Sequence, residues 1–304
     1  MALRLGSRGS ALAVAQATLV RERLETLGAE VEVITIRTSG DERPGGMPAP
    51  ETGDKARFVK EIEDSLLRGE IDLAVHSAKD VPGELPEGLA IVGVPARADA
   101  RDALCGVASI DDLGDGAVVG TASLRRRAQL LAWRPDLDVR EVRGNVDTRL
   151  RRLADGAYDA LVLAAAGLAR LRREEGAPIP EDAMTPAPGQ GCLALEARAD
   201  DTATAGLADQ LTDRDSLVVL TAERALVTAL EATCRTPVGA HARLAGSELA
   251  LDAFAGMPDG SRWIRDSASG DAADPAALGR CVAERMLAAG ARELLDAAER
   301  AGEG

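Results

Sequence analysis

The sequence is poor in aromatic residues, histidine and cysteine, and it contains no long apolar run. Two phenylalanines, two tryptophans and one tyrosine occur among 304 residues, so a core has to be built from alanine, valine and leucine. No apolar stretch approaches the ~20 residues of a membrane-spanning helix. The opening residues also lack an apolar signal core followed by a cleavage site. These absences predict a cytoplasmic protein that does not insert into a membrane.

The two histidines and four cysteines argue against a metal centre or a disulfide framework. The cysteines at positions 105, 192, 234 and 281 lie far apart and without CxxC spacing. Acidic residues outnumber basic ones by 50 to 36, and the net charge of −14 argues against a nucleic-acid surface. A hydrophobic content of 46% is that of a globular protein, and the length allows two or three domains.

Hydrophobic spacing predicts an α/β protein with two similar cycles of strands and helices. Strands separated by helices favour parallel pairing through βαβ units. The Pro- and Gly-rich segment 43–54 is expected to be a loop. The first cycle is predicted as strand Leu3–Gly6, a helix from Ser10 to near Gly28, strand Val31–Ile36, a helix through Val59 and Leu67, and strands Ile71–His76 and Leu89–Val94.

The second cycle begins near residue 96, and the alternation of strands and helices ends near residue 215. Its predicted elements are strands Ala117–Gly120, Val139–Val142 and Ala160–Leu163, with helices Leu124–Trp133 and Val146–Leu153. The last part predicts a small α+β domain with helix Leu217–Leu230, strands Glu248–Phe254 and Arg262–Ser267, and one long helix Pro275–Arg300. No short internal repeat is visible.

Four predicted strand ends carry small hydroxyl residues, open helix N-termini and arginines. They are residues 6–10, 76–80, 120–127 and 143–149. In parallel sheets, ligands bind beyond the carboxyl ends of the strands, and backbone N–H groups and guanidinium forks both bind anions. A single such cluster is usually a helix cap beside a solvated face. Four of them in an acidic chain predict binding of a polyanion.

Two residues leave alternatives open, Asp80 in the second of these regions and Cys234 outside all four. Asp80 is either a salt-bridge partner of Lys79 or a neighbouring arginine, or a buried carboxylate that handles a proton or a developing positive charge. Cys234 is either a small buried apolar residue or, beside Arg235, a nucleophile or attachment point. His76 and the other three cysteines are interpreted as core or helical residues.

Nine segments, in register from Leu3 to about residue 243, resemble the porphobilinogen deaminase (hydroxymethylbilane synthase) family. The resemblance rests on GSR-x-S at 6–10, TSGD at 38–41, FVKEIE at 58–63, HSAKDVP at 76–82, GTASLRR at 120–126, RGNVDTRL at 143–150, AAGLARL at 165–171, PAPGQG at 186–191 and TCRTPVG at 233–239.

The resemblance implies two domains like type II periplasmic binding proteins with a cleft between them, followed by a small α+β domain. Its domain ranges are 1–95 with 191–213, then 96–190, then 214–304. It also implies a dipyrromethane cofactor joined by a thioether to Cys234, with no metal or nucleotide. Four porphobilinogen molecules would be added head to tail with loss of ammonia, and hydroxymethylbilane would be released by water. The family further suggests a monomer.

The resemblance assigns roles to residues by motif position. Asp80 matches the catalytic aspartate, Phe58 the aromatic residue beside the cofactor, and segment 43–55 the segment that covers the cleft. Lys79, Thr121, Ser123, Arg125, Arg126 and Gly144 would bind the cofactor. Arg8, Ser10, Lys55, Ser77, Arg143, Arg149, Arg170 and Gln190 would bind the substrate carboxylates.

Three positions depart from the commonest family pattern, and two other functions compete. Ala56-Arg57 replaces Gly-Leu before Phe58, Ala122 stands at a frequent serine, and Asp147 adds a negative charge near the anion site. A non-catalytic two-lobed anion-binding protein of the same fold would not need Asp80 and Cys234. A phosphate-handling enzyme would need a phosphate loop such as GxxxxGK[ST], which the sequence lacks.

Overall fold

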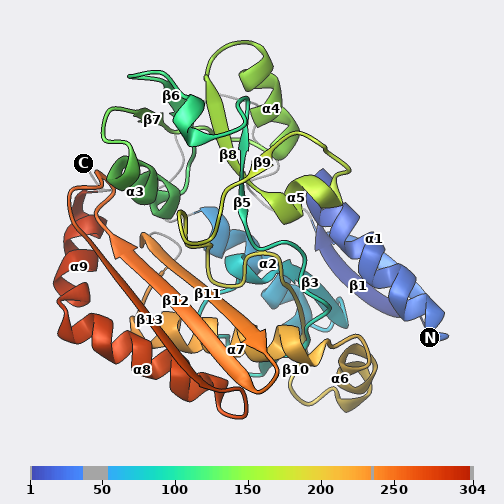
Figure 1. Cartoon of the computed structure of the whole chain (residues 1–304). Helices are drawn as coiled ribbons and strands as arrows, with labels where there is room; N and C mark the ends of the chain where they lie inside the picture. The colour runs from blue at the N-terminus through green and yellow to red at the C-terminus, as the bar shows by residue number, and fades with distance from the viewer. Residues whose placement is uncertain (1, 37–53, 234–235, 302–304) are drawn as a thin grey trace. The chain divides into compact units, whose positions relative to one another are not determined.

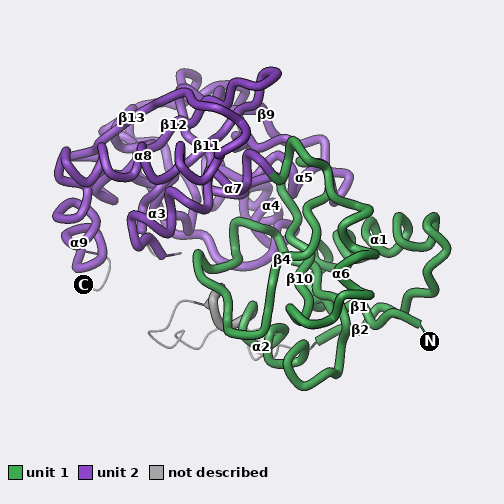
Figure 2. Tube along the Cα trace, turned by 90° about the horizontal axis from the view of Figure 1, so that it is seen from below, with its two compact units in different colours: residues 1–97, 192–217 green, residues 98–191, 218–304 purple. Residues whose placement is uncertain are grey.

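The computed structural model describes residues 2–36, 54–233 and 236–301, and the side chains of 54–58 are likewise outside the described part. The chain forms two compact units, residues 1–97 with 192–217 and residues 98–191 with 218–304 (Figure 2). We call them unit 1 and unit 2. This division keeps the C-terminal segment with the middle of the chain, so the three predicted domain ranges remain a prediction.

The sheet of unit 1 has the order β2-β1-β3-β10-β4. Strand β1 is parallel to β2 and β3, whereas β10 is antiparallel to both β3 and β4. The predicted parallel pairing is therefore found among the first three strands, whereas β10, a strand that the sequence did not predict, runs antiparallel between β3 and β4. The strands are β1 Leu3–Arg8, β2 Val31–Ile36, β3 Leu73–Ser77, β4 Leu89–Gly93 and β10 Leu193–Arg198.

Helices cover both faces of this sheet. Helix α1, Ala11–Thr26, packs against β1, β2 and β3, and α6, Thr202–Asp209, against β4 and β10. Helix α2, Asp54–Leu67, packs against β1, β3, β4, β10 and the short 3₁₀ helix η1, Ala78–Asp80. Alternate side chains of β3 separate the two cores, because Leu73 and Val75 join the α1 core whereas Ala74 joins the α2 core.

The sheet of unit 2 repeats the strand order of unit 1. Its order is β7-β6-β8-β5-β9, with β5 antiparallel to its neighbours β8 and β9. If the antiparallel strand of each sheet is set aside and the other four are numbered along the chain, both sheets have the order second, first, third, antiparallel strand, fourth. The repeat is one of strand order, which explains why no sequence repeat shows it. The elements are β5 Asp102–Cys105, η2 Ile110–Asp112, β6 Val118–Gly120, α3 Leu124–Trp133, β7 Asp138–Arg140, α4 Val146–Ala154, β8 Ala160–Ala164, α5 Ala165–Arg170 and β9 Ala177–Pro178.

The last part of the chain folds as a three-stranded antiparallel sheet covered by helices (Figure 1). Its elements are α7 Arg214–Ala229, β11 Val238–Ala245, β12 Glu248–Gly256, β13 Trp263–Asp271, α8 Pro275–Ala288 and α9 Ala291–Ala301. Two of these strands were predicted from the sequence, and β11 was missed. The single long helix was also wrong, because Gly290 adopts a φ of +92°, a left-handed conformation that ends α8.

These sheets and helices confirm the predicted α/β class with a small C-terminal α+β part. The cores consist mainly of alanine, valine and leucine, as the shortage of aromatic residues required. Among the described helices, none is both long enough and apolar enough to span a bilayer.

Candidate functional site

The end of β3 in unit 1 opens into a small pocket. The cavity measures about 90 Å³, and its polar lining comes from Arg8, Ser10, Gln16, His76, Ser77 and Asp80. Arg8 ends β1, Ser10 caps α1, and Ser77 is followed directly by η1, which carries Asp80. The structure thus brings together four residues that the sequence predicted as a site, namely Arg8, Ser10, Ser77 and Asp80.

Local geometry holds the pocket residues in place. The Ser10 hydroxyl accepts a hydrogen bond from the Ala13 N–H at 3.3 Å, which caps α1. The Ala78 N–H donates to the Cys192 carbonyl at 3.1 Å and so fastens η1 to the start of β10. Asp80 is half-buried, and its Oδ1 atom is shielded from solvent. A small, partly enclosed polar pocket results.

Gln16 belongs to this pocket and was missed by the sequence analysis. Its side chain is 4% exposed, and its Nε2 donates to the Ser77 hydroxyl at 2.9 Å. That bond leaves the Ser77 hydrogen free to point into the pocket. The available signal was a polar residue within the buried stripe of α1, beside Ala17 and Val20.

In unit 2, Asp102 gathers three of the predicted site residues in a buried network. Its Oδ2 lies 2.8 Å from Arg125 Nη1, and its Oδ1 accepts from Arg126 Nε and from Gln190 Nε2, both at 2.9 Å. Burial by itself would raise the pKa of Asp102, but the two guanidinium charges hold it far below its ordinary value. Asp102 was not predicted as a site residue, although its place at the start of a short apolar run was visible.

The network retains a surplus of positive charge. Two guanidinium groups face one carboxylate, and Arg125 and Arg126 also donate to the carbonyls of Thr185 and Val162. The Nε of Arg125 is buried without a hydrogen-bond partner among the described residues. Burial and the charge of Arg126 lower the pKa of Arg149. An anion at this end of the sheet would relieve that surplus.

The other predicted residues of unit 2 surround this network or take part in local contacts. The Ser123 hydroxyl accepts from the Arg126 N–H at 3.5 Å, and the Thr121 hydroxyl accepts from the Ser123 N–H at 3.2 Å. Gly144 has a φ of +110° and forms the turn before α4. Arg170 donates to the Gly191 carbonyl at 2.7 Å.

Two charges at the edge of this region are balanced by neighbours. Arg143 pairs with Glu141 at 2.7 Å on the surface. Asp147, the departure that adds a negative charge, forms an ion pair with Arg173. The added carboxylate is thereby neutralised locally.

Several predicted positions lie outside the described residues. They are Cys234, the side chains of Lys55 and Phe58, the Ala56-Arg57 pair and the segment 37–53. Of the described cysteines, Cys105 and Cys192 are buried and Cys281 is exposed on α8. Burial raises the pKa of the Cys105 thiol to about 11. The described part of the chain holds no group of three or more His, Cys, Asp or Glu side chains suited to a metal ion.

Comparison with known proteins decides the family. Residues 3–206 match the family model described as the dipyromethane cofactor binding domain of porphobilinogen deaminase, and residues 217–288 match that of its C-terminal domain. The chain belongs to the porphobilinogen deaminase family. The second match extends the resemblance beyond residue 243, where the sequence motifs ended.

Curated porphobilinogen deaminases are similar over nearly their whole length. The protein of Geobacter sulfurreducens is 45% identical over 298 residues, which are 96% of this chain and 93% of that protein. The protein of Deinococcus deserti is 46% identical over 97% of this chain and 98% of its own. The protein of Paracoccus denitrificans is 48% identical over 93% of each.

Solved structures with a similar fold include a periplasmic substrate-binding protein of an ABC transporter from Coxiella burnetii. It has 13% identity and a TM-score of 0.43, and covers 69% of this chain and 91% of its own. The periplasmic VFT2 domain of BvgS from Bordetella pertussis has 18% identity and a TM-score of 0.40, over 69% and 86%. At this level of similarity, the strand order of each sheet is the stronger description of the fold.

Family membership confirms four predictions made from the sequence. They are the resemblance itself, a transferase acting on porphobilinogen, a dipyrromethane cofactor, and a place in tetrapyrrole synthesis. The roles of single residues stay predictions.

Proposed function

We propose that Asp80 is the catalytic carboxylate of this porphobilinogen-condensing transferase. The assignment rests on the position of Asp80 after β3, where this residue shares a pocket with Arg8, Ser10 and Ser77. A carboxylate among anion-binding groups would weaken a site that only held anions, whereas it suits a reaction that develops positive charge.

Within this pocket, each residue type has a distinct role. Arg8, Ser10 and Ser77 bind acetate or propionate groups of porphobilinogen through charge-assisted hydrogen bonds. Asp80 stabilises the methylene-pyrrolenine cation that porphobilinogen becomes when its carbon–nitrogen bond breaks and ammonia leaves. Its carboxylate also assists proton transfer at the pyrrole nitrogen.

The buried network of unit 2 fits an anionic cofactor. Dipyrromethane carries acetate and propionate groups, and the surplus positive charge around Asp102 is what such groups would neutralise. Arg125, Arg126, Ser123, Thr121 and Gly144 would hold it there, with Lys79 and a thioether to Cys234. When bound, dipyrromethane supplies the primer on which pyrrole rings are added. The chain's own residues hold its carboxylates and keep the site positive.

The intact mass of the purified protein tests the cofactor and the reaction together. We expect wild type to carry the extra mass of a dipyrromethane and to gain mass in single pyrrole steps with porphobilinogen. Cys234→Ala should show the bare mass, and Cys281→Ala, at an exposed position on α8, is the matched control that keeps the adduct. A bare wild-type chain that porphobilinogen cannot reconstitute would favour the non-catalytic anion-binding protein.

Arg143 should matter after the first additions, when more carboxylates have to be held. Arg143→Leu is expected to shift the intact-mass distribution toward products with fewer added rings, because an exposed guanidinium is lost. Arg140→Leu removes a neighbouring exposed arginine, paired with Asp138, and should leave the distribution unchanged. The same distribution in both variants would show that Arg143 does not bind the growing chain.

We also propose that the protein acts as a cytoplasmic monomer with the three domains 1–95 with 191–213, 96–190 and 214–304. The family resemblance supports this organisation. Size-exclusion chromatography with light scattering checks the oligomeric state against the mass of 31.5 kDa.

A further inference from the structure

A cluster of three buried ionisable side chains lies behind the pocket of unit 1 and has no role in the mechanism above. It consists of Glu63 on α2, His76 on β3 and Glu196 on β10, which are 5%, 5% and 0% exposed. The strand register pairs His76 with Ala194 and Glu196 with Ala74. The His76 and Glu196 side chains are therefore diagonal neighbours on one face of the sheet, the face that α2 covers.

The polar atoms of this cluster are poorly satisfied. His76 Nε2 lies 2.9 Å from Glu196 Oε2, but without the alignment of a hydrogen bond. His76 Nε2, Glu63 Oε1 and both carboxylate oxygens of Glu196 are shielded from solvent and lack a hydrogen-bond partner among the described residues. Buried polar groups are nearly always hydrogen-bonded. Several such atoms without a partner in one place indicate that a mobile proton or a bound water satisfies them.

Charge balance points to a shared proton. Two ionised carboxylates facing one imidazole would leave uncompensated negative charge in a buried place, which is costly. Burial and the charge of Glu196 raise the pKa of Glu63 to about 7, with smaller contributions from His76, Asp64 and Lys60. Glu63 thus exchanges a proton close to neutral pH, beside an imidazole and a second carboxylate that can share it.

The remaining elements around Glu63 bring few other charges. Helix α2 also carries Glu61, Asp64 and the exposed Lys60, β10 carries Arg198, and β4 carries no titratable side chain. The end of β1 and the helix η1 contribute Arg8, Lys79 and Asp80. Of these, Arg8 and Asp80 line the pocket.

His76 connects the cluster to the pocket. Its side chain contacts Glu196 on one side and forms part of the wall shared with Arg8, Ser77 and Asp80. A charge that appears on the cluster acts on the pocket across a few ångströms of low-dielectric interior, where screening is weak.

We propose that Glu63, His76 and Glu196 are positioning residues that share one proton, and that the charge of this cluster sets how tightly the pocket holds the carboxylates of porphobilinogen. The inference rests on the function proposed for the pocket. Loss of the shared proton makes the cluster one unit more negative and repels a bound carboxylate. Binding should therefore weaken as the pH rises through neutrality, whereas the chemistry at Asp80 changes less.

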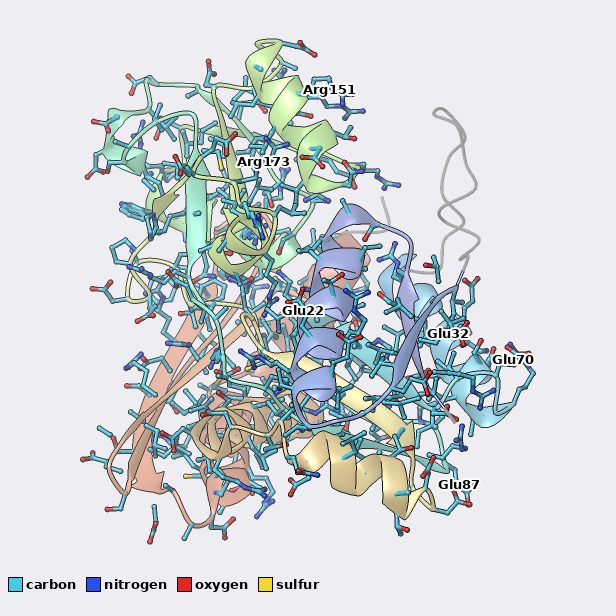
Figure 3. The ribbon with its side chains drawn as sticks, turned by 90° about the vertical axis from the view of Figure 1, so that its right-hand side faces the viewer. Glu22, Glu32, Glu70, Glu87, Arg151 and Arg173 are labelled. Atoms are coloured by element: carbon cyan, nitrogen blue, oxygen red, sulfur yellow. The ribbon has the colours of Figure 1, made fainter. Side chains whose placement is uncertain are left out.

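The test compares the pH dependence of KM and kcat in wild type and Glu63→Gln. We expect the wild-type KM for porphobilinogen to rise about threefold to tenfold between pH 6 and 8.5, with a smaller change in kcat. Glu63→Gln preserves shape and cannot ionise, so its KM should stay at the low-pH value throughout. Glu22→Gln removes an exposed carboxylate on α1 (Figure 3) and should keep the wild-type profile.

Nuclear magnetic resonance of the imidazole rings provides a readout that needs no turnover. The chain has two histidines, and His241→Asn identifies the His76 signals. In wild type these signals should respond to the ionisation of the neighbouring Glu63, and this response should be absent in Glu63→Gln. If Glu63→Gln does not fold, Glu63→Met serves the same purpose, because it also removes the ionisable group.

The outcomes separate this inference from the proposed function. An Asp80-dependent wild type whose KM profile is unchanged in Glu63→Gln would overturn the cluster's role and leave the function standing. His76 signals with the same pH dependence in both forms would also overturn it. Failure of the function would appear differently, as a wild type without turnover or an Asp80 variant with normal turnover.

Discussion

Asp80→Asn is expected to lower the rate of porphobilinogen consumption by about 10²–10³-fold while the protein keeps its fold and its bound cofactor. The amide has nearly the shape of the carboxylate, so the pocket formed with Arg8 and Ser77 should persist. What is lost is the negative charge that stabilises the cation formed when ammonia leaves. A proton acceptor is lost with it, and both losses act on the chemical step.

The rate of ammonia release and the intact mass measure these two properties separately. Ammonia release should fall, whereas the mass of the dipyrromethane adduct should remain. Glu87→Gln removes an exposed carboxylate elsewhere in unit 1 (Figure 3) and should release ammonia at the wild-type rate. Normal turnover of Asp80→Asn would show that another group supports the reaction and that the assignment is wrong.

Asp102→Ala is expected to cause the largest loss of stability of any single substitution considered. Asp102 is fully buried and is the acid that both Arg125 and Arg126 contact. Without it, two buried guanidinium groups repel each other, and breaking a buried ion pair in this way costs about 3–5 kcal/mol. In a chain of this size the free-energy loss corresponds to about 5–8 °C in Tm. The distorted arginines should also retain less cofactor.

Thermal unfolding and intact mass check this prediction, with Asp112→Ala, at an exposed position of η2, as the matched control. The control should unfold within about 1–2 °C of wild type, since surface substitutions cost little. An unchanged Tm for Asp102→Ala would mean that the arginines find other partners.

The pH dependence of this ion pair follows from the lowered pKa of Asp102. A carboxyl whose pKa falls on folding contributes stability that is present above its unfolded pKa. This stability is lost as the pH drops toward the folded value. The contribution of Asp102 should therefore persist through neutral and mildly acidic pH and disappear only in strong acid. Asp102→Ala should approach wild-type stability there.

Local signals in the sequence predicted most elements well. Helix Leu124–Trp133 has the predicted bounds, and Ser10 caps α1 as its position before an apolar stripe indicated. The strand Val31–Ile36 is also as predicted. Caps, apolar spacing and Gly turns are properties of residues close together in the chain, which is why they can be read without the fold.

The errors concern strands that were not predicted at all, among them β5 and β10, and the pairing between distant segments. Strand β10 runs antiparallel between β3 and β4, and β5 does the same between β8 and β9. A short apolar run does not reveal its direction or its neighbours, because these depend on where the chain returns to the sheet. The break at Gly290 was overlooked since one glycine within a helical pattern is often tolerated.

The sequence by itself determined the family, the α/β alternation and the strand ends that carry arginines, hydroxyls and Asp80. Only the tertiary structure decided that Asp102 holds Arg125 and Arg126, and that Glu63 and Glu196 face each other beside His76. Motifs and helix caps depend on neighbours in the chain. Ion pairing, desolvation and the resulting pKa values depend on distances between groups that only folding brings together.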